Sequence, residues 1–397
     1  MSKCLSESSG PSLSQQVRHI LIDTLKTHLP LDIEARTLDE TKLWELVLYA
    51  SVQGISLDST CQELDEVPSG NRVREHIKEA FDASALRLVA LEDDLNAALY
   101  SGLPSSLIKR AGRKGYDIGI DLVEIPYYGQ PAQVDEEIRR GSARSGTTRF
   151  HAYATLAVVH HGQRYEMALS FVWADETMEQ VVQRLLIQAQ GIGLRIRRAY
   201  LDKGFAREAV YALLRQKRIP YLIPLPIRGK TGGLKALCQG AGSYRTTHTF
   251  NAGTPQAYTT EVILICRYSK GRYGRHGCQW FAYATYGMER VPLAQIFPLY
   301  RRRFGMESGY RQMHQVRACT TSANPTWRLL LVGVAFLLYN VYIHFRQNGR
   351  QVNPYDRRAR TPWLSLKRMA RMILRLIEQR LGVADFEPGG LHESGLS

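Results

Sequence analysis

The first hundred residues follow a helical pattern of apolar and polar positions. The periodicity begins near Ser14 and resumes at Thr37, where capping residues precede apolar side chains spaced three and four positions apart. It continues to a stop at Gly102. The pattern predicts an α-helical N-terminal domain over residues 1–104, in which the serine-rich first segment is not expected to fold.

Two interpretations of this N-terminal domain remain open. Short helices joined by tight turns, with the breaker PSGN at 68–71, are typical of a helix-turn-helix module that binds DNA. Arg72, Arg74 and Lys78 give the last of these helices a basic edge. The segment as a whole is acidic, which favours a plain helical interaction domain equally.

The period changes to two at Tyr116. Segment 116–126 alternates as a strand, whereas segment 127–149 is polar and is expected to be a loop. Strands follow on both sides of the turn at 161–163, and the chain then continues as helix, strand, helix and strand. This order predicts a mixed α/β sheet, with the first part of the core at 105–228.

The amino-acid composition changes after residue 228. Gly and Thr are frequent over 229–290, and two apolar stretches there alternate as strands, so we expect a β-rich insertion within the core. Helices return over 291–350, the last part of the core, and a basic helix and tail follow at 351–397. The longest apolar run, Leu329–Tyr339, is too short to cross a bilayer and suits a buried helix.

The charge is unevenly distributed along the 397 residues. Residues 1–100 hold 9 Lys+Arg and 17 Asp+Glu, whereas residues 101–397 hold 43 and 20, for a net charge of +15 overall. Such a basic surface attracts nucleic acid or anionic lipid. Only the basic amphipathic segment 365–382 supports a membrane surface, so we expect nucleic acid as the partner and no membrane.

The cysteines form no CxxC pair and no zinc-type spacing with histidine. They are Cys4, Cys61, Cys238, Cys266, Cys278 and Cys319. The N-terminus also lacks the apolar segment of a signal peptide. We therefore expect reduced thiols in a cytoplasmic protein.

The stretch Tyr300–Arg317 concentrates positive charge around one acid, Glu307. Its arginines are Arg301, Arg302, Arg303, Arg311 and Arg317. At helical spacing Arg303, Glu307, Arg311 and His314 share one face. A lone carboxylate in a positive face suits a metal ion that meets a polyphosphate chain, although a solvated helix with an Arg–Glu pair explains it equally well.

Two further acids fall at informative places in the predicted sheet. Asp121 lies midway along the first strand, and Asp202 lies at the carboxyl end of the strand before Gly204. Ligands gather at the carboxyl ends of strands in α/β sheets, and a strand tolerates a buried Asp when its charge is paired or holds a metal. With Glu307, these carboxylates are able to hold two hard divalent ions.

Each of these acids also has a structural explanation. Asp121 suits a solvated sheet face or an ion pair with arginine, and Asp202 suits the chemistry of a turn. Asp117 and Glu124 are rival carboxylates near Asp121, which we rank lower.

Here the residues show a resemblance. The segments DLVEIPYYG at Asp121, YLDKGFAREAVYALL at Asp202 and Tyr300-x2-Arg303-x3-Glu307-x6-His314 resemble the DDE transposases of bacterial insertion sequences, in the insertion-sequence-4-like group. His314 departs from the family signature, which has Lys there. The resemblance covers about residues 105–350 and implies a retroviral-integrase-like, RNase H-like core that a β insertion interrupts between Asp202 and Glu307.

The resemblance implies metal-dependent DNA chemistry. Asp121, Asp202 and Glu307 would be both the metal ligands and the catalytic residues, holding two Mg²⁺ ions for cleavage at transposon ends and strand transfer into target DNA. Mn²⁺ is the expected substitute. The partners would be double-stranded DNA and further copies of the chain, at least a dimer on DNA, in the nucleoid of a bacterial cell.

Several other residues are predicted to bind DNA. Tyr300 and Arg303 would hold the scissile or a neighbouring phosphate, and His314 would contact phosphate in the place of Lys. Sequence-neutral backbone contacts would come from Arg301, Arg302, Arg311 and Arg317. Trp280 is a candidate for stacking on an unpaired base, although a packed aromatic of a β-sheet is favoured.

Two rival functions use the same residues. A catalytically inactive, transposase-derived DNA-binding regulator is consistent with His314, but the presence of all three acids argues against it. Another RNase H-like nuclease would cleave without joining 3′-hydroxyl ends to a target.

Overall fold

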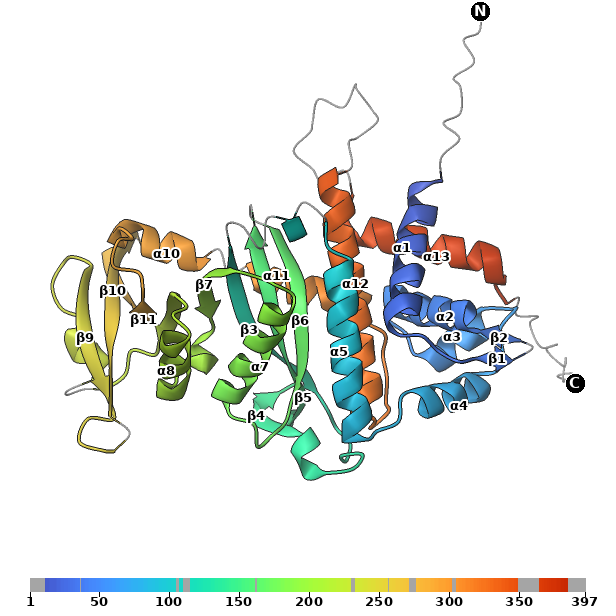
Figure 1. Ribbon diagram of the computed structural model, residues 1–397, viewed down its shortest axis with the longest axis horizontal. Coiled ribbons are helices and arrows are strands. Elements are labelled where there is room, and N and C mark those ends of the chain that lie inside the picture. Colours follow the sequence, from blue (N-terminus) through green and yellow to red (C-terminus); the bar gives the residue numbers. More distant parts are fainter. Residues whose placement is uncertain are drawn as a thin grey trace, which may run out of the picture.

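The computed structural model describes most of the chain. The described residues are 11–35, 37–104, 107–109, 115–160, 163–229, 233–255, 257–270, 276–301, 305–348 and 364–384. Figure 1 shows an elongated molecule, with helices at one end, a large sheet in the middle and the strands of the predicted insertion at the other end.

Helices build the N-terminal end. They are α1 (Leu13–His28), α2 (Glu40–Gln53), α3 (Leu57–Glu63), α4 (Gly70–Ala80) and α5 (Ala85–Ser101), with a short hairpin of β1 (Glu34–Ala35) and β2 (Leu38–Asp39) before α2. Side chains cap the first turns of α1, α2, α3 and α5, as where Asp39 accepts from the backbone of Lys42. Gly54 ends α2 in the left-handed conformation that glycine adopts without strain.

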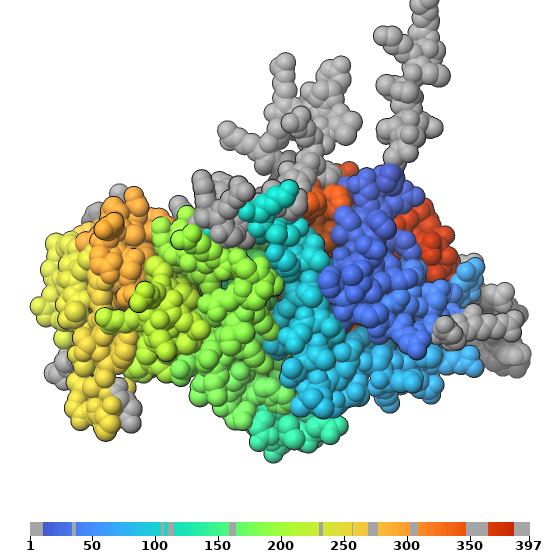
Figure 2. Space-filling model, viewed as in Figure 1, coloured from blue at the N-terminus to red at the C-terminus, as the bar shows by residue number. Residues whose placement is uncertain are grey.

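The last helix, α13 (Leu366–Leu381), packs on the first two. Its Arg380 Nε lies 2.9 Å from Oε1 of the fully buried Glu45, and Arg18 Nε of α1 lies 2.6 Å from the same oxygen. A carboxylate that is removed from water needs such partners. Residues from both ends of the chain therefore form one helical unit, whose surface continues into α5 and the core (Figure 2).

The central sheet has the mixed topology that the sequence predicted. Its described core strands are β3 (Tyr116–Pro126), β5 (Thr147–His160), β6 (Gln163–Val172), β7 (Ile196–Leu201) and β8 (Tyr221–Leu225), in the spatial order β6-β5-β3-β7-β8. β3, β7 and β8 are parallel neighbours, whereas β5 is antiparallel to β3 and β6. This arrangement confirms the RNase H-like fold class.

One strand of the central sheet was predicted to be a loop. β4 (Arg139–Arg144) lies in the segment predicted to be a loop, after the short helix η1 (Asp135–Glu137), and it pairs with the start of β5. Its residues are mostly polar and exposed because it pairs only with the first residues of β5, so no apolar alternation marks it.

Helices cover both faces of the sheet. α7 (Met178–Gly191) and α8 (Glu208–Gln216) lie in front of it in Figure 1, and α11 (Gly305–Met313) lies behind. The long helix α12 (Pro325–Asn348) lies beside α5 along β6. Its segment Pro325–Arg346 is apolar and long enough to span a membrane, but 89% of that stretch is buried in the protein, as in the core helix of a soluble fold.

Side chains of α5 and α12 cap the outer edge of β6. The amide of Asn96 exchanges two hydrogen bonds with the backbone of Leu169, at 3.1 and 2.7 Å. The amide of Asn340 does the same with the backbone of Glu166, at 2.7 and 3.0 Å. An exposed strand edge is a template for unwanted pairing, and these side chains take the place of the missing strand.

The predicted insertion continues the central sheet. β9 (Tyr244–Phe250), β10 (Tyr258–Lys270) and β11 (His276–Tyr286) follow the short helix α9 (Leu234–Leu237), and β11 pairs with β8. The sheet therefore runs unbroken from β6 to β9.

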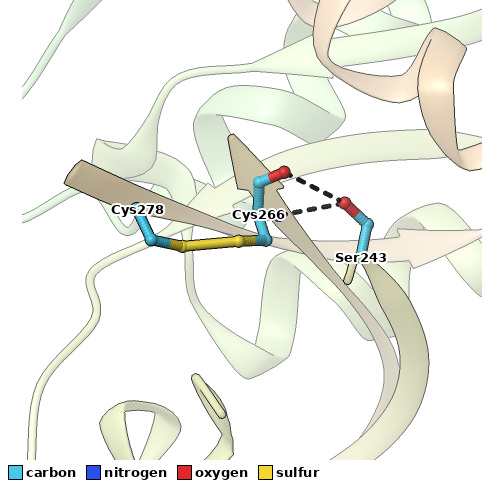
Figure 3. Close-up of a disulfide and its surroundings, with 3 residues drawn as sticks. All are labelled: Ser243, Cys266 and Cys278. Carbon is cyan, nitrogen blue, oxygen red and sulfur yellow. Dashed lines mark hydrogen bonds between the residues drawn. A yellow bond between two sulfur atoms is a disulfide. The ribbon is translucent and has the colours of Figure 1, made fainter. Parts of the chain in front are cut away.

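A disulfide joins Cys266 of β10 to Cys278 of β11, which corrects the prediction of six reduced thiols (Figure 3). The antiparallel register places these cysteines diagonally on one face, with their Cα atoms 6.3 Å apart. The hydroxyl of Ser243, the residue before β9, accepts a hydrogen bond from the backbone N–H of Cys266 and donates one to its carbonyl. Sequence spacing alone does not reveal a cross-strand pair, because the register that creates it is a tertiary property.

Candidate active site

The strand register brings two of the three predicted acids together. β3 and β7 are parallel, and Ile120 pairs with Leu201. The next residue on each chain segment is Asp121 and Asp202, respectively. Neighbouring strands lie about 4.8 Å apart, so the two aspartates start from adjacent backbone positions.

The two aspartates have different surroundings. Asp121 is only 7% exposed, and its Oδ1 accepts a hydrogen bond of 2.9 Å from the backbone of Leu122. Asp202 is partly buried at the point where β7 ends, and its carbonyl accepts from Phe205 at 3.0 Å in the turn η2 (Lys203–Phe205). The strand end and this turn fix the backbone of both residues.

The rival carboxylates on β3 are held in ion pairs. Asp117 is buried, 2.7 Å from Arg197 Nε and 3.1 Å from the Tyr200 hydroxyl. Glu124 forms an ion pair with Arg144 of β4. Their charges are therefore satisfied within the protein, which supports the lower rank that the sequence gave them.

The helix that carries Glu307 lies against β3 and β5. Glu307 belongs to α11, and Tyr310 follows it by three positions on the same helix face. The Tyr310 hydroxyl lies 2.6 Å from the Thr155 hydroxyl, and Thr155 is the register partner of Asp121. The backbone of the third acid therefore lies beside the strand that carries the first, while its side chain is outside the described atoms.

Asp121 and Asp202 have the type of side chain that binds a hard divalent cation. Carboxylate oxygens at a strand end are suitable ligands for Mg²⁺. Among the described side chains no group of three or more His, Cys, Asp or Glu forms a metal cluster, and the third ligand of the hypothesis, Glu307, is not among those side chains.

Comparison with known families agrees with this geometry. Residues 115–339 match the family model described as "Transposase DDE domain". The chain belongs to the DDE transposase domain family. It is thus an enzyme of the transposase kind, and the match does not separate the insertion-sequence-4-like group from others, so that part of the assignment stays a prediction.

Solved structures extend the likeness to the fold. The DDE chain is similar to a piggyBac transposase in a cryo-EM structure of its synaptic complex with hairpin DNA, with a TM-score of 0.50 and 11% sequence identity. The similarity covers 96% of this chain and 85% of that chain. At this identity the likeness concerns the fold alone. No curated protein matches the sequence.

Tyr300, predicted to contact DNA, is buried in this DDE domain. Tyr300 ends α10 (Leu293–Arg301), packs on Tyr283, and donates a hydrogen bond of 3.3 Å to the carbonyl of Leu201. Leu201 directly precedes Asp202. Tyr300 therefore anchors the strand end that carries the second aspartate, a contact that the sequence did not indicate.

The other predicted DNA contacts are scattered around the site. Arg301 and Arg311 are exposed on α10 and α11, whereas Arg302 and Arg303 lie outside the described residues. His314 begins η4 (His314–Val316), where burial and, secondarily, Arg317 lower its imidazole pKa. Trp280 is half-buried and packs edge-on against Tyr244, as a sheet aromatic does.

One acid near the site was missed. Glu166 of β6 is fully buried, and neither carboxylate oxygen has a well-formed hydrogen bond among the described residues. Burial raises the pKa of Glu166 to about 7, while Arg164 lowers it and Asp121 raises it. Apolar and polar residues alternate along β6, so the sequence alone did not show whether Glu166 is buried or exposed to solvent.

Proposed function

We propose that this enzyme cleaves DNA at the ends of a mobile element and joins the 3′ ends to a target. Asp121, Asp202 and Glu307 serve as the ligands of two divalent ions, Mg²⁺ or Mn²⁺. The observation that carries the proposal is the register of β3 and β7, which gives adjacent positions on neighbouring parallel strands to Asp121, midway along β3, and Asp202, directly after β7. The family match supports the reaction class.

The bound ions supply activation of the attacking water or 3′-hydroxyl and stabilise the leaving oxygen. The protein's own residues hold the geometry. The backbone of Leu122 fixes one oxygen of Asp121, and Tyr300 holds the backbone just before Asp202. No covalent link between protein and DNA is required, so no Ser or Tyr nucleophile is needed.

The positive residues supply the DNA contacts of this proposal. Arg301, Arg302, Arg303, Arg311 and Arg317 bind backbone phosphates, so affinity falls steeply with salt concentration. His314 contacts a backbone phosphate in the place of the usual Lys. Trp280 remains a weaker candidate. The pairing of two DNA ends requires at least a dimer on DNA.

A plasmid that carries the sequences flanking the encoding gene tests the proposal. With Mg²⁺ the protein is expected to nick this DNA and to join the released ends to a second plasmid. Asp202→Ala is expected to abolish both reactions and to keep DNA affinity within about threefold, because the residue lies at the metal site rather than among the arginines.

The rivals give different products in the same assay. Cleavage without joined products would identify a nuclease of the same fold. Binding without cleavage under any divalent ion would identify a DNA-binding regulator. Inverted repeats around the gene would independently support a mobile element.

A further inference from the structure

A cavity of about 380 Å³ lies further along β3 from Asp121, at the Ile125 end of the strand. Ile125 of β3 and Tyr153 of β5 line it. Tyr153 pairs with Val123, two positions from Asp121 on β3, and alternate residues of a strand share a face. A strand rises about 3.3 Å per residue. Tyr153 therefore lies about 7 Å along the sheet from Asp121 and Ile125 lies about 13 Å from it, so the cavity begins near the first distance and extends past the second.

Two arginines enter this cavity. Arg317 follows η4, and Arg328 lies on α12; both line the cavity, and no Asp or Glu is among its described lining residues. Arg328 is 8% exposed and donates from Nε to the carbonyl of Ser322 at 2.5 Å and from Nη2 to that of Thr320 at 3.3 Å. Burial lowers the pKa of both guanidinium groups, yet arginine stays charged at neutral pH.

Buried like charges are normally paired with acids. Here two guanidinium groups share a cavity whose other described walls are apolar and aromatic residues with Cys319, Thr320 and Thr321, all uncharged. The Arg328 guanidinium lies 4.6 Å from the centre of the Tyr127 ring, and Tyr128 is 68% exposed at the rim. The walls therefore offer an anion site and an aromatic surface side by side.

The size excludes a simple ion as the whole ligand. Cavities of roughly 300–1,000 Å³ hold small organic molecules, which need apolar contact as well as one or two polar anchors. The ligand must be an anion with a flat apolar part. A nucleotide has both, with a phosphate for the arginines and a base for the tyrosines.

We infer that this cavity binds one unpaired nucleotide of a DNA strand whose neighbouring phosphate lies at Asp121 and Asp202. The inference rests on the proposed function. It names Arg317 as the phosphate contact, the exposed ring of Tyr128 as the surface for the base, and single-stranded DNA next to the cut as the ligand. Arg328 positions Tyr127 and the chain at 320–322.

Equilibrium binding in Ca²⁺, without cleavage, tests the inference. The probes are a blunt duplex and the same duplex with a three-nucleotide single-stranded overhang. The wild-type protein is expected to prefer the overhang by about tenfold. Tyr128→Ala is expected to remove the preference while leaving blunt-duplex affinity within about threefold. Arg317→Ala is expected to remove the preference as well and to lower the affinity for both duplexes, because it also deletes a phosphate contact.

Arg195→Ala is the matched control, because it removes one exposed positive charge outside the cavity. It is expected to keep the preference. A second readout is alkylation of Cys319, an exposed thiol that lines the cavity, mapped by mass spectrometry. The overhang duplex should slow this alkylation severalfold, whereas the blunt duplex should not.

Three results would overturn the inference. They are an equal affinity for both duplexes, a preference that survives both substitutions, and protection of Cys319 by free dAMP at lower concentration than by the overhang, which would indicate a free-nucleotide site. Since the assay measures binding, loss of cleavage alone would contradict the proposed function and leave this test intact.

Discussion

Asp121→Asn is expected to reduce Mg²⁺-dependent nicking at least about a thousandfold. The amide keeps the shape of the side chain and can still accept the hydrogen bond from Leu122, but it removes the negative charge that holds a divalent ion. Single-turnover cleavage of the flanking-DNA plasmid measures the effect. Affinity for the same DNA should change by less than about threefold.

Glu124→Gln is the matched control for this loss. Glu124 lies three residues further along β3 and is paired with Arg144, so its charge serves the β4 contact. The change is expected to leave nicking within about threefold. If Asp121→Asn kept more than about a tenth of the activity, or if Glu124→Gln lost as much, Asp121 would not be a metal ligand.

The position of this site was predictable only in part from sequence. The sequence indicated both residues, because Asp121 lies inside a predicted strand and Asp202 lies where a second strand ends. A charged side chain in a buried strand is normally paired or bound to a metal. Their adjacency was not available, since the pairing of Ile120 with Leu201 joins segments about eighty residues apart. Many registers between β3 and β7 are compatible with the sequence pattern, and only the packing of the complete sheet selects one of them.

The missed features share one physical cause. Asn96 and Asn340 read as ordinary polar residues of apolar helices, but each substitutes for a strand at the edge of β6. Cys266 and Cys278 bond because two strands place them diagonally. In each case the partner lies on another element, so local periodicity carries no signal.

Glu166→Gln is expected to stabilise the metal-free protein at pH 8 and to have little effect at pH 5. The folded-state pKa of about 7 lies above the usual 4.5, so the folded state binds this proton more tightly than the unfolded state. Stability from this group is therefore complete below about pH 4.5 and falls as the pH rises toward 7. The neutral amide does not suffer this loss, which amounts to about 3 kcal/mol by pH 8.

Urea denaturation of both proteins in EDTA, at pH 5 and pH 8, measures the difference. The stability gap between the variant and the wild type should widen by about 2–3 kcal/mol between the two pH values, whatever its value at pH 5. Comparison across pH removes any constant packing effect of the amide, because that effect is the same at both values. A gap that does not widen would mean that Glu166 is ionised at its usual pKa, with partners that satisfy its charge beneath α12.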